Sequence, residues 1–174
     1  MFGLPPMLKK RGGAIVPPLF LTVSNSTHLE RIDFMAEFTN VNIQTIAAGQ
    51  NVPLTETAIS SKPCIVHREG SGLVTLRGLT NQCRAVFKIS YGGNIAIPTG
   101  GTVEAITAAL SINGEALASA TATVTPAAVE NYFNIYVSAQ VCVPKGCCVT
   151  VGMRNTSTQA VNFANSNLTV ERVA

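Results

Sequence analysis

From about residue 40 to the C-terminus, the chain consists of short runs of alternating apolar and polar residues, separated by Gly, Asn and Pro. Alternation with a period of two residues is typical of strands that bury one face. The pattern predicts eight strands, in NVNIQTI, PCIVH, GLVTLRG, CRAVFKISY, EAITAALSI, NYFNIYVSAQVCV, CCVTVGMRN and NLTVERV. Short strands with turn residues between them indicate an all-β protein, an antiparallel sandwich, barrel or jelly roll.

The first 24 residues have a different residue pattern. Proline and glycine recur here at a spacing that excludes both a helix interior and a central strand. The sequence therefore predicts an extended N-terminal arm over residues 1–24. The residues that exclude regular secondary structure there are Pro5, Pro6, Gly12, Gly13, Pro17 and Pro18.

For residues 25–40 the sequence predicts a short helix or a linker, which would connect the arm to a head domain at 41–174. Thr27 is followed three residues later by Glu30, the pattern of a capping box. Apolar residues follow at helical spacing. They are Leu29, Ile32, Met35 and Ala36. A strand is the alternative for RIDFMAEF.

The strand faces suggest where the molecule makes contacts. In NYFNIYVSAQVCV the core face is expected to hold Phe133, Ile135, Val137, Ala139, Val141 and Val143. The opposite face carries Tyr132, Asn134, Tyr136, Ser138, Gln140 and Cys142, which combine two aromatic rings with no charge. Aromatic enrichment with charge depletion is the compositional sign of a buried contact. The alternative is a merely neutral sheet surface.

The strand EAITAALSI has the same character. Ile106, Ala108, Leu110 and Ile112 form its expected core face. Its other face is small and uncharged, with Ala105, Thr107, Ala109 and Ser111. The interface candidates are therefore Tyr132, Tyr136, Gln140, Cys142, Cys148, Thr107 and Ala109.

The five cysteines can be placed by the same phase. Cys147 is in phase with Val149 and Cys83 with Ala85, so both are expected in the core as small hydrophobic residues. Cys148 is expected to share the outer face with Cys142 across a turn. Packed thiols, a cross-strand disulfide and a cluster near an oligomer axis all remain open for that pair; Cys64 is undetermined. Adjacent cysteines point to opposite faces of a strand, which disfavours a zinc site.

Composition adds that much of the surface is neutral or hidden. Charged residues make up 12% of the chain, against about 25% in an ordinary soluble domain. The net charge is +3, and Lys9, Lys10 and Arg11 account for it, because nine basic residues then face nine acidic ones. Such an arm suits solubilising, docking on an acidic surface or contact with nucleic acid. The candidates for anchoring are Lys9, Lys10, Arg11, Pro17, Pro18 and Phe20.

Candidate chemistry is sparse. Asp33 is the only aspartate, the eight glutamates are scattered, and His67, Arg68 and Glu69 are interpreted as a solvated turn. No nucleotide, hydrolase or metalloprotease motif occurs. We therefore expect no enzyme and no catalytic, cofactor or metal site; nucleic-acid binding is supported by KKR alone. No segment predicts a membrane span or a signal peptide, which indicates synthesis in a cytosol.

Four stretches carry a family resemblance: IAAGQNVPLTETAI as a first strand, TNQCRAVFKISYGGNIAIP, AALSINGEAL with its Asn-Gly turn, and VPKGCCVTVGMRNTS leading to NLTVERVA. Together, residues 41–174 resemble the trimeric jelly roll shared by tumour necrosis factor, complement-type globular heads and the heads of bacterial collagen-like exosporium proteins. The chain departs from such heads in having KGCC where Gly-Asp is common, and in lacking a collagen-like stalk.

The resemblance implies a homotrimer whose neutral outer faces pack around a three-fold axis. Similar heads with short arms occur among tailed-phage structural proteins. The first hypothesis is therefore a non-enzymatic protein of the virion surface, such as a capsid decoration, head fibre or tail appendage, made in the host cytoplasm. Its arm would dock on other virion proteins such as the major capsid protein. The alternatives are a spore- or cell-surface head that binds a glycan or protein, and a small capsid protein whose basic arm contacts nucleic acid.

Overall fold

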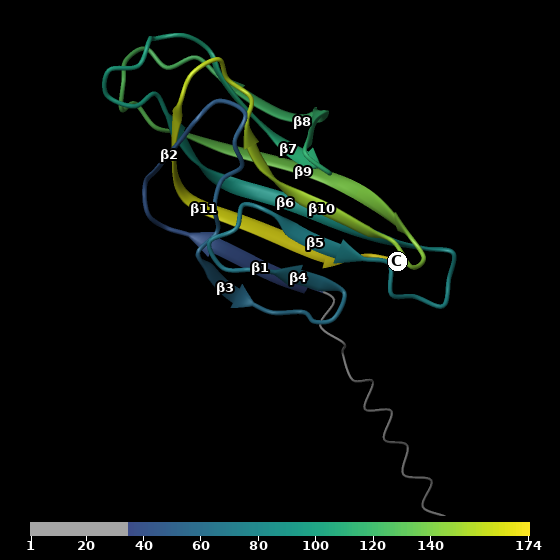
Figure 1. The fold of residues 1–174 in the computed structure, drawn as a ribbon. Coiled ribbons are helices and arrows are strands. Elements are labelled where there is room, and N and C mark those ends of the chain that lie inside the picture. The colour runs from purple at the N-terminus through teal and green to yellow at the C-terminus, as the bar shows by residue number, and fades with distance from the viewer. Residues whose placement is uncertain (1–34) are drawn as a thin grey trace, which may run out of the picture. The chain divides into compact units, whose positions relative to one another are not determined.

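The computed structural model describes residues 35–174 (Figure 1). The predicted arm at 1–24 and residues 25–34 of the predicted helix lie outside this range. The described residues form eleven strands. They are β1 (Met35–Asn40), β2 (Gln44–Ile46), β3 (Glu56–Ile59), β4 (Ile65–His67), β5 (Val74–Arg77), β6 (Arg84–Ala96), β7 (Ile106–Ile112), β8 (Glu115–Val124), β9 (Phe133–Pro144), β10 (Cys148–Asn155) and β11 (Val161–Arg172).

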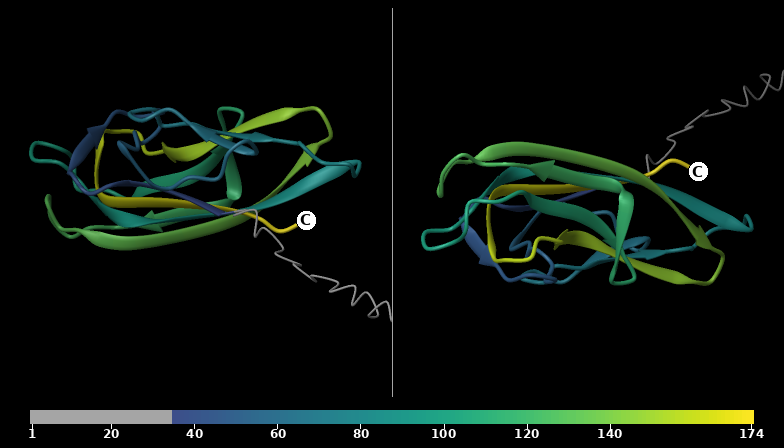
Figure 2. Two further views of the ribbon diagram at one scale, coloured as in Figure 1. Left: turned by 90° about the horizontal axis from the view of Figure 1, so that it is seen from below. Right: turned by 90° about the horizontal axis from the view of Figure 1, so that it is seen from above.

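The strands form two facing sheets, which the views of Figures 1 and 2 show as two layers. The large sheet has the order β3-β1-β11-β6-β9, with β2 paired to β11, and the small sheet has the order β4-β5-β10-β7-β8. Every pair is antiparallel. Most connections between consecutive strands pass from one sheet to the other, so the fold is a jelly-roll sandwich. The predicted fold class is confirmed.

The predicted core face of β9 is also confirmed. Ile135, Val137, Val141 and Val143 are buried, while Tyr136 and Gln140 are exposed. The inner sides of the two sheets bury one continuous core. Its largest members include Phe38, Phe87, Phe163, Leu76, Leu110 and Met153. Burial of this apolar surface is the main force that holds the sandwich together.

Residues 35–40 were predicted as part of a helix or linker, with a strand as the alternative for RIDFMAEF; in the described part the helix is wrong and the strand is confirmed. They form β1, in which Ala36, Phe38 and Asn40 are buried and the residues between them are not. β1 pairs with β11 from Met35 to Asn40. The partner strand overrode the local helical spacing, and the strand adds residues 35–40 to the head predicted at 41–174.

The first strand assigned to IAAGQNVPLTETAI is also different. Only β2 at its start and β3 at its end are strands; Asn51 in between makes an isolated bridge to Arg154 of β10. β8 was missed because its small residues alternate poorly and its pairing with β7 is irregular between Ala109 and Ser111. The Asn-Gly turn before β8 is confirmed, with φ of 52° at Asn113 and 87° at Gly114.

The outer side of β7 is not free, contrary to the sequence interpretation. Ala109 and Ser111 are fully buried. The Ser111 hydroxyl donates to Asn51 Oδ1 at 3.0 Å, and Arg154, opposite Ala109, donates to the carbonyls of Gly49 and Gly114. Loops therefore cover this part of the small sheet.

One buried polar pair links two strands of the large sheet. Tyr91 of β6 lies 2.8 Å, oxygen to oxygen, from the hydroxyl of Ser166 in β11, and both residues are buried. A Cβ at Gly93 would lie 2.9 Å from the Tyr91 hydroxyl, so glycine leaves the phenol room. Burial, opposed by the bond to Ser166, raises the pKa of Tyr91 from 10.0 to about 12.

This shift predicts a loss of stability at high pH. The unfolded chain releases the Tyr91 proton at lower pH than the folded chain does, so between about pH 10 and 12 it binds fewer protons. The free energy of unfolding should then fall with rising pH, by up to about 2.7 kcal/mol. Tyr91→Phe should lose this part of the pH dependence and cost about 1–2 kcal/mol near neutral pH, because Ser166 loses its partner. Denaturant unfolding of both proteins at pH 8–12 measures this, and parallel curves would contradict it.

Candidate functional site

The candidate site is the outer face of the large sheet, which we call the neutral face. Strand pairing brings uncharged side chains from four strands into adjacent rows. They are Thr39, Ser90, Gly92, Asn94, Asn134, Tyr136, Ser138, Gln140, Asn167 and Thr169. A sheet face of this kind exposes neutral hydrogen-bonding groups around an aromatic ring, as contact surfaces do.

Tyr136 lies on β9, the strand at one edge of the neutral face. Its side chain is 65% exposed. It lies directly opposite Gly92, where a Cβ would be 4.0 Å from the ring carbon Cδ2, so the ring lies beside a position without a side chain. Hydrogen bonding to Ser90 lowers the pKa of the Tyr136 phenol. The ring is thus presented on a flat, polar surface.

The hydroxyl and amide groups around Tyr136 bond to one another across the strands. The oxygens of Ser90 and Ser138 are 3.1 Å apart, and Asn134 Nδ2 donates to Asn94 Oδ1 at 3.2 Å. These short side chains lose little conformational entropy when they are covered. The neutral face is therefore suited to rigid packing against another surface.

Beyond one end of β1, the structure adds two apolar residues that the sequence analysis did not single out. Val41 and Ile43 are 60% and 62% exposed. With Asn94 and Tyr132 they line a cavity of about 360 Å³. Tyr132 is half-buried there, and burial raises the pKa of its phenol. In the sequence, Val41 and Ile43 alternate with polar residues as in an ordinary strand, so only their observed exposure identifies them.

Charge lies toward the other end of the neutral face. Lys88 pairs with Gln140 on one side and with Glu171 on the other. Glu37 accepts a hydrogen bond from Asn167. Tyr136 lies in a different row of the sheet. Its neighbours there are Gly92 and Asn167, which carry no charge.

The predicted interface residues divide between two surfaces. Tyr136, Gln140 and Cys142 lie on the outer side of β9, with Tyr132 just before the strand. Thr107, Ala109 and Cys148 lie in the small sheet. The half-buried Thr107 is occupied by bonds to Thr156 and Ser157, and Ala109 has no exposed surface. The structure therefore brings only the first group together.

The predicted shared face of Cys142 and Cys148 is wrong. Cys142 pairs opposite Val86 in the large sheet, whereas Cys148 pairs opposite Arg77 in the small sheet. The connection between β9 and β10 passes from one sheet to the other, so it is not a hairpin. All five cysteines are free thiols.

Cys83 and Cys147 were expected in the core, and this too is wrong, since both are exposed. They lie just before β6 and β10 begin, where alternation no longer decides which way a side chain points. Cys64, which the pattern left undetermined, is the buried cysteine.

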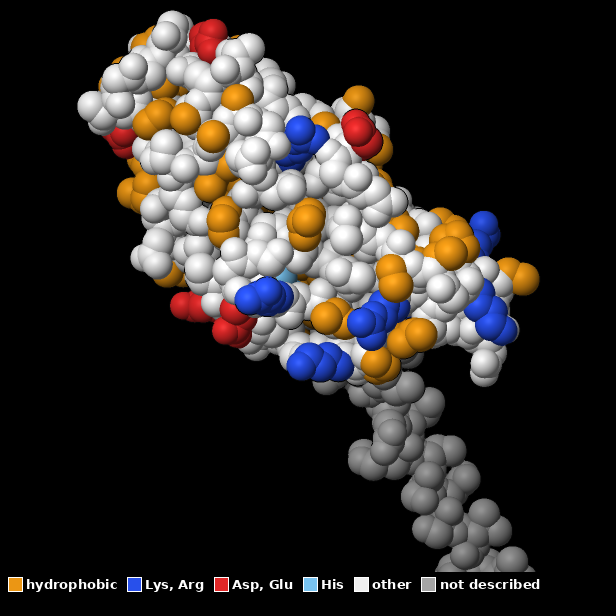
Figure 3. All heavy atoms as spheres, viewed as in Figure 1, with side chains coloured by type: hydrophobic (Ala, Val, Ile, Leu, Met, Phe, Trp, Pro, Cys, Tyr) orange, Lys and Arg blue, Asp and Glu red, His pale blue; other side chains and the backbone are white. Residues whose placement is uncertain are grey.

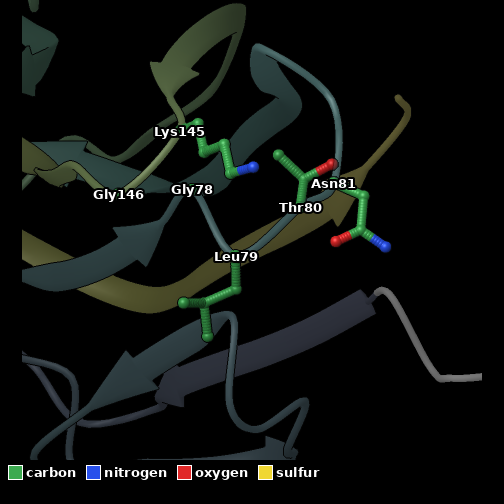
Figure 4. Close-up of a pocket in the computed structure, with 6 residues that line it drawn as sticks. All are labelled: Gly78, Leu79, Thr80, Asn81, Lys145 and Gly146. Atoms are coloured by element: carbon green, nitrogen blue, oxygen red, sulfur yellow. The ribbon is translucent and has the colours of Figure 1, made fainter.

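A second cavity, of about 390 Å³, lies at this end of the molecule (Figure 4). Lys145 points toward Thr80 across it, and Leu79 points the other way (Figure 4). With one basic side chain and no acidic group among its lining residues, this cavity offers little for catalysis. Within residues 35–174 no cluster of His, Cys, Asp or Glu could hold a metal, and no helix is long and apolar enough to cross a membrane.

Comparison of the folded chain with solved structures gives matches to several jelly-roll proteins. An Eiger TNF from S. frugiperda is similar with a TM-score of 0.60 at 12% identity, over 81% of this chain and 92% of that one. The globular domain of a zebrafish complement 1qA protein matches with a TM-score of 0.51 at 8% identity, over 80% and 97%. PRD1 vertex protein P5 matches with a TM-score of 0.46 at 11% identity, over 82% and 99%.

The first two of these likenesses show a TNF-like jelly-roll fold. At the level of sequence, neither the protein-family models nor the curated proteins give a match.

Proposed function

We propose that this chain is a non-enzymatic structural protein that assembles as a homotrimer through the neutral face. The observation that carries the proposal is the exposed Tyr136 ring on the edge strand β9, with uncharged neighbours on β6. Val41 and Ile43 extend it with apolar surface. Covering aromatic and apolar groups is favourable, and Gly92 and Asn167, the next residues across the strands from Tyr136, carry no charge that would have to be desolvated.

A second copy of the chain is the occupant that best suits the face. Its polar groups are serine, threonine and asparagine, which both donate and accept, so one part of the face can pair with a different part of the face on a second copy, as a closed ring of copies requires. The resemblance of residues 41–174 to trimeric heads supports three copies around one axis. Each protomer would contribute β9 and β6 to the contact.

The finer proposal is a role on a virion surface, as a capsid decoration, head fibre or tail appendage. The basic arm with Lys9, Lys10 and Arg11 supports docking on an acidic surface of another virion protein, such as the major capsid protein. Flanking capsid and tail genes would support this role. Flanking sporulation or export genes would favour a spore- or cell-surface head instead.

Assembly is tested by native mass spectrometry of the full chain, with and without reductant, and of a variant lacking residues 1–24. We expect a trimer in all three samples, because the proposed contact is made by the folded head and requires no disulfide. Loss of the trimer with reductant would assign assembly to the thiols, and its loss with the deletion would assign assembly to the arm. A monomer throughout would refute the proposal.

A further inference from the structure

A cavity of about 390 Å³ opens at the edge of the sandwich where β3 passes to β4. Its lining includes polar and charged side chains from both strands, from the connection between them and from the turn after β4. They are Thr57, Ser60, Lys62, His67, Arg68 and Glu69. Buried Phe38 and Ile65 form its apolar wall. A pocket of this size with a few converging polar groups is typical of a small-molecule site.

The turn after β4 is firmly placed. Ser71 N donates to the Arg68 carbonyl at 2.9 Å, which closes the turn, and Gly70 adopts a φ of 82° within it. Gly70 N donates in turn to the Leu54 carbonyl at 2.7 Å. Arg68 and Glu69 are therefore held at the rim of the cavity by backbone bonds.

His67 is the one buried polar feature of the pocket that is not satisfied. Its Nε2 donates to the Ser71 carbonyl at 3.0 Å, which leaves Nδ1 as an acceptor. Nδ1 is buried and has no hydrogen-bond partner among the residues that the structure describes. The ring packs on Phe38 with 4.6 Å between centroids, so its orientation is fixed. An acceptor held in this way favours a hydroxyl donor from a ligand.

The charges of the lining favour an anion. Lys62 and Arg68 supply two positive charges against one negative charge from Glu69. Figure 3 shows basic side chains gathered over the lower part of one face of the head, with acidic side chains beside them. Arg68 and Glu69 also line a further cavity, of about 360 Å³.

We propose that this pocket binds a carboxylated sugar, with the carboxylate at Lys62 and Arg68 and a sugar hydroxyl donating to Nδ1 of His67. Guanidinium and ammonium groups bind carboxylates through charge-assisted bonds. The hydroxyls of Thr57 and Ser60, with the carboxylate of Glu69, offer partners for the remaining sugar hydroxyls. The prediction of a solvated turn agrees with the exposure of Arg68 and Glu69, whereas His67 lies in β4 with a buried Nδ1.

The pocket lies within one protomer, so its test does not depend on the trimer. The full chain, labelled with nitrogen-15, is titrated with methyl β-D-glucuronide and, separately, with neutral methyl β-D-glucoside, while the ring signals of His67 are followed by NMR. We expect the glucuronide to shift these signals at millimolar concentration. The glucoside should bind about tenfold or more weakly, because it lacks the carboxylate.

Three variants and a control locate the binding. Lys62→Gln, Arg68→Gln and His67→Phe should each weaken glucuronide binding about tenfold, measured by calorimetry. Lys145→Gln, at a different cavity, should leave it unchanged. Lys62 and Arg68 are exposed, so they remain informative if His67→Phe does not fold. Three outcomes would each overturn the proposal: equal binding of both sugars, no shift at His67, or binding only after removal of residues 1–24. The last outcome would mean that the arm occupies the pocket.

Discussion

Tyr136→Glu is expected to convert the proposed trimer into folded monomers. In the assembly, the new carboxylate would be buried in the row of Gly92 and Asn167, which offers it no basic partner; Lys88 pairs two rows away, with Gln140. An uncompensated buried charge costs about 3 kcal/mol or more, which weakens association at least about 100-fold. In the monomer the side chain is exposed, so the fold should survive.

The matched control is Thr123→Glu. Thr123 is also exposed on a strand, but it lies opposite Thr107 in the small sheet. This variant should remain a trimer. Sedimentation velocity at several protein concentrations measures both, and circular dichroism checks the fold. If Tyr136→Glu stays trimeric, or if both variants dissociate alike, the neutral face is not the contact.

Gly152→Ala is expected to destabilise the head by about 4 kcal/mol, more than most overpacking substitutions do. Gly152 lies in the middle of β10, where a Cβ would be 2.2 Å from the carbonyl oxygen of Gly72. Because the obstacle is backbone, a rotamer change cannot relieve it. The turn that carries Gly72 would have to leave β10, and the bonds between Leu54 and that turn would be lost.

Gly92→Ala is the control for this prediction. Gly92 is also a strand glycine, but its nearest neighbour to a new Cβ is a Tyr136 ring atom at 4.0 Å, an ordinary contact. This variant should change stability by less than about 1 kcal/mol. Urea unfolding at one fixed protein concentration compares the two, since assembly adds to apparent stability. Equal effects would mean that the turn carrying Gly72 moves away from β10 at little cost in stability.

The long strands could be predicted from sequence because their alternation is regular. β6, β7, β9 and β10 all lie where the pattern put them, and so does the Asn113–Gly114 turn. β1 and β3 could not be predicted with the same ease. In β1 the helical spacing of Met35 and Ala36 competed with the strand pattern, and pairing with β11 decided the outcome.

The candidate site was predictable in part. Alternation along β9 identified Tyr136 and Gln140 as outward residues, and the structure agrees. The same rule failed for Ala109, because period-two alternation says which side of a strand a residue faces and not what covers that side. It also failed for Cys83 and Cys147, which lie beyond the ends of their strands.

By itself, the sequence determined the fold class, the core face of the long strands and the neutral character of the surface, since these depend on side-chain polarity at a fixed local period. Only the tertiary structure decided which faces remain exposed, that β9 and β10 belong to different sheets, and that His67 lines a pocket. Each of these depends on segments distant in the chain: the Gly72 turn over β10, the pairing of β9 with β6 alone, and the Phe38 ring against His67. No local pattern encodes such contacts, because they form only when the two sheets pack.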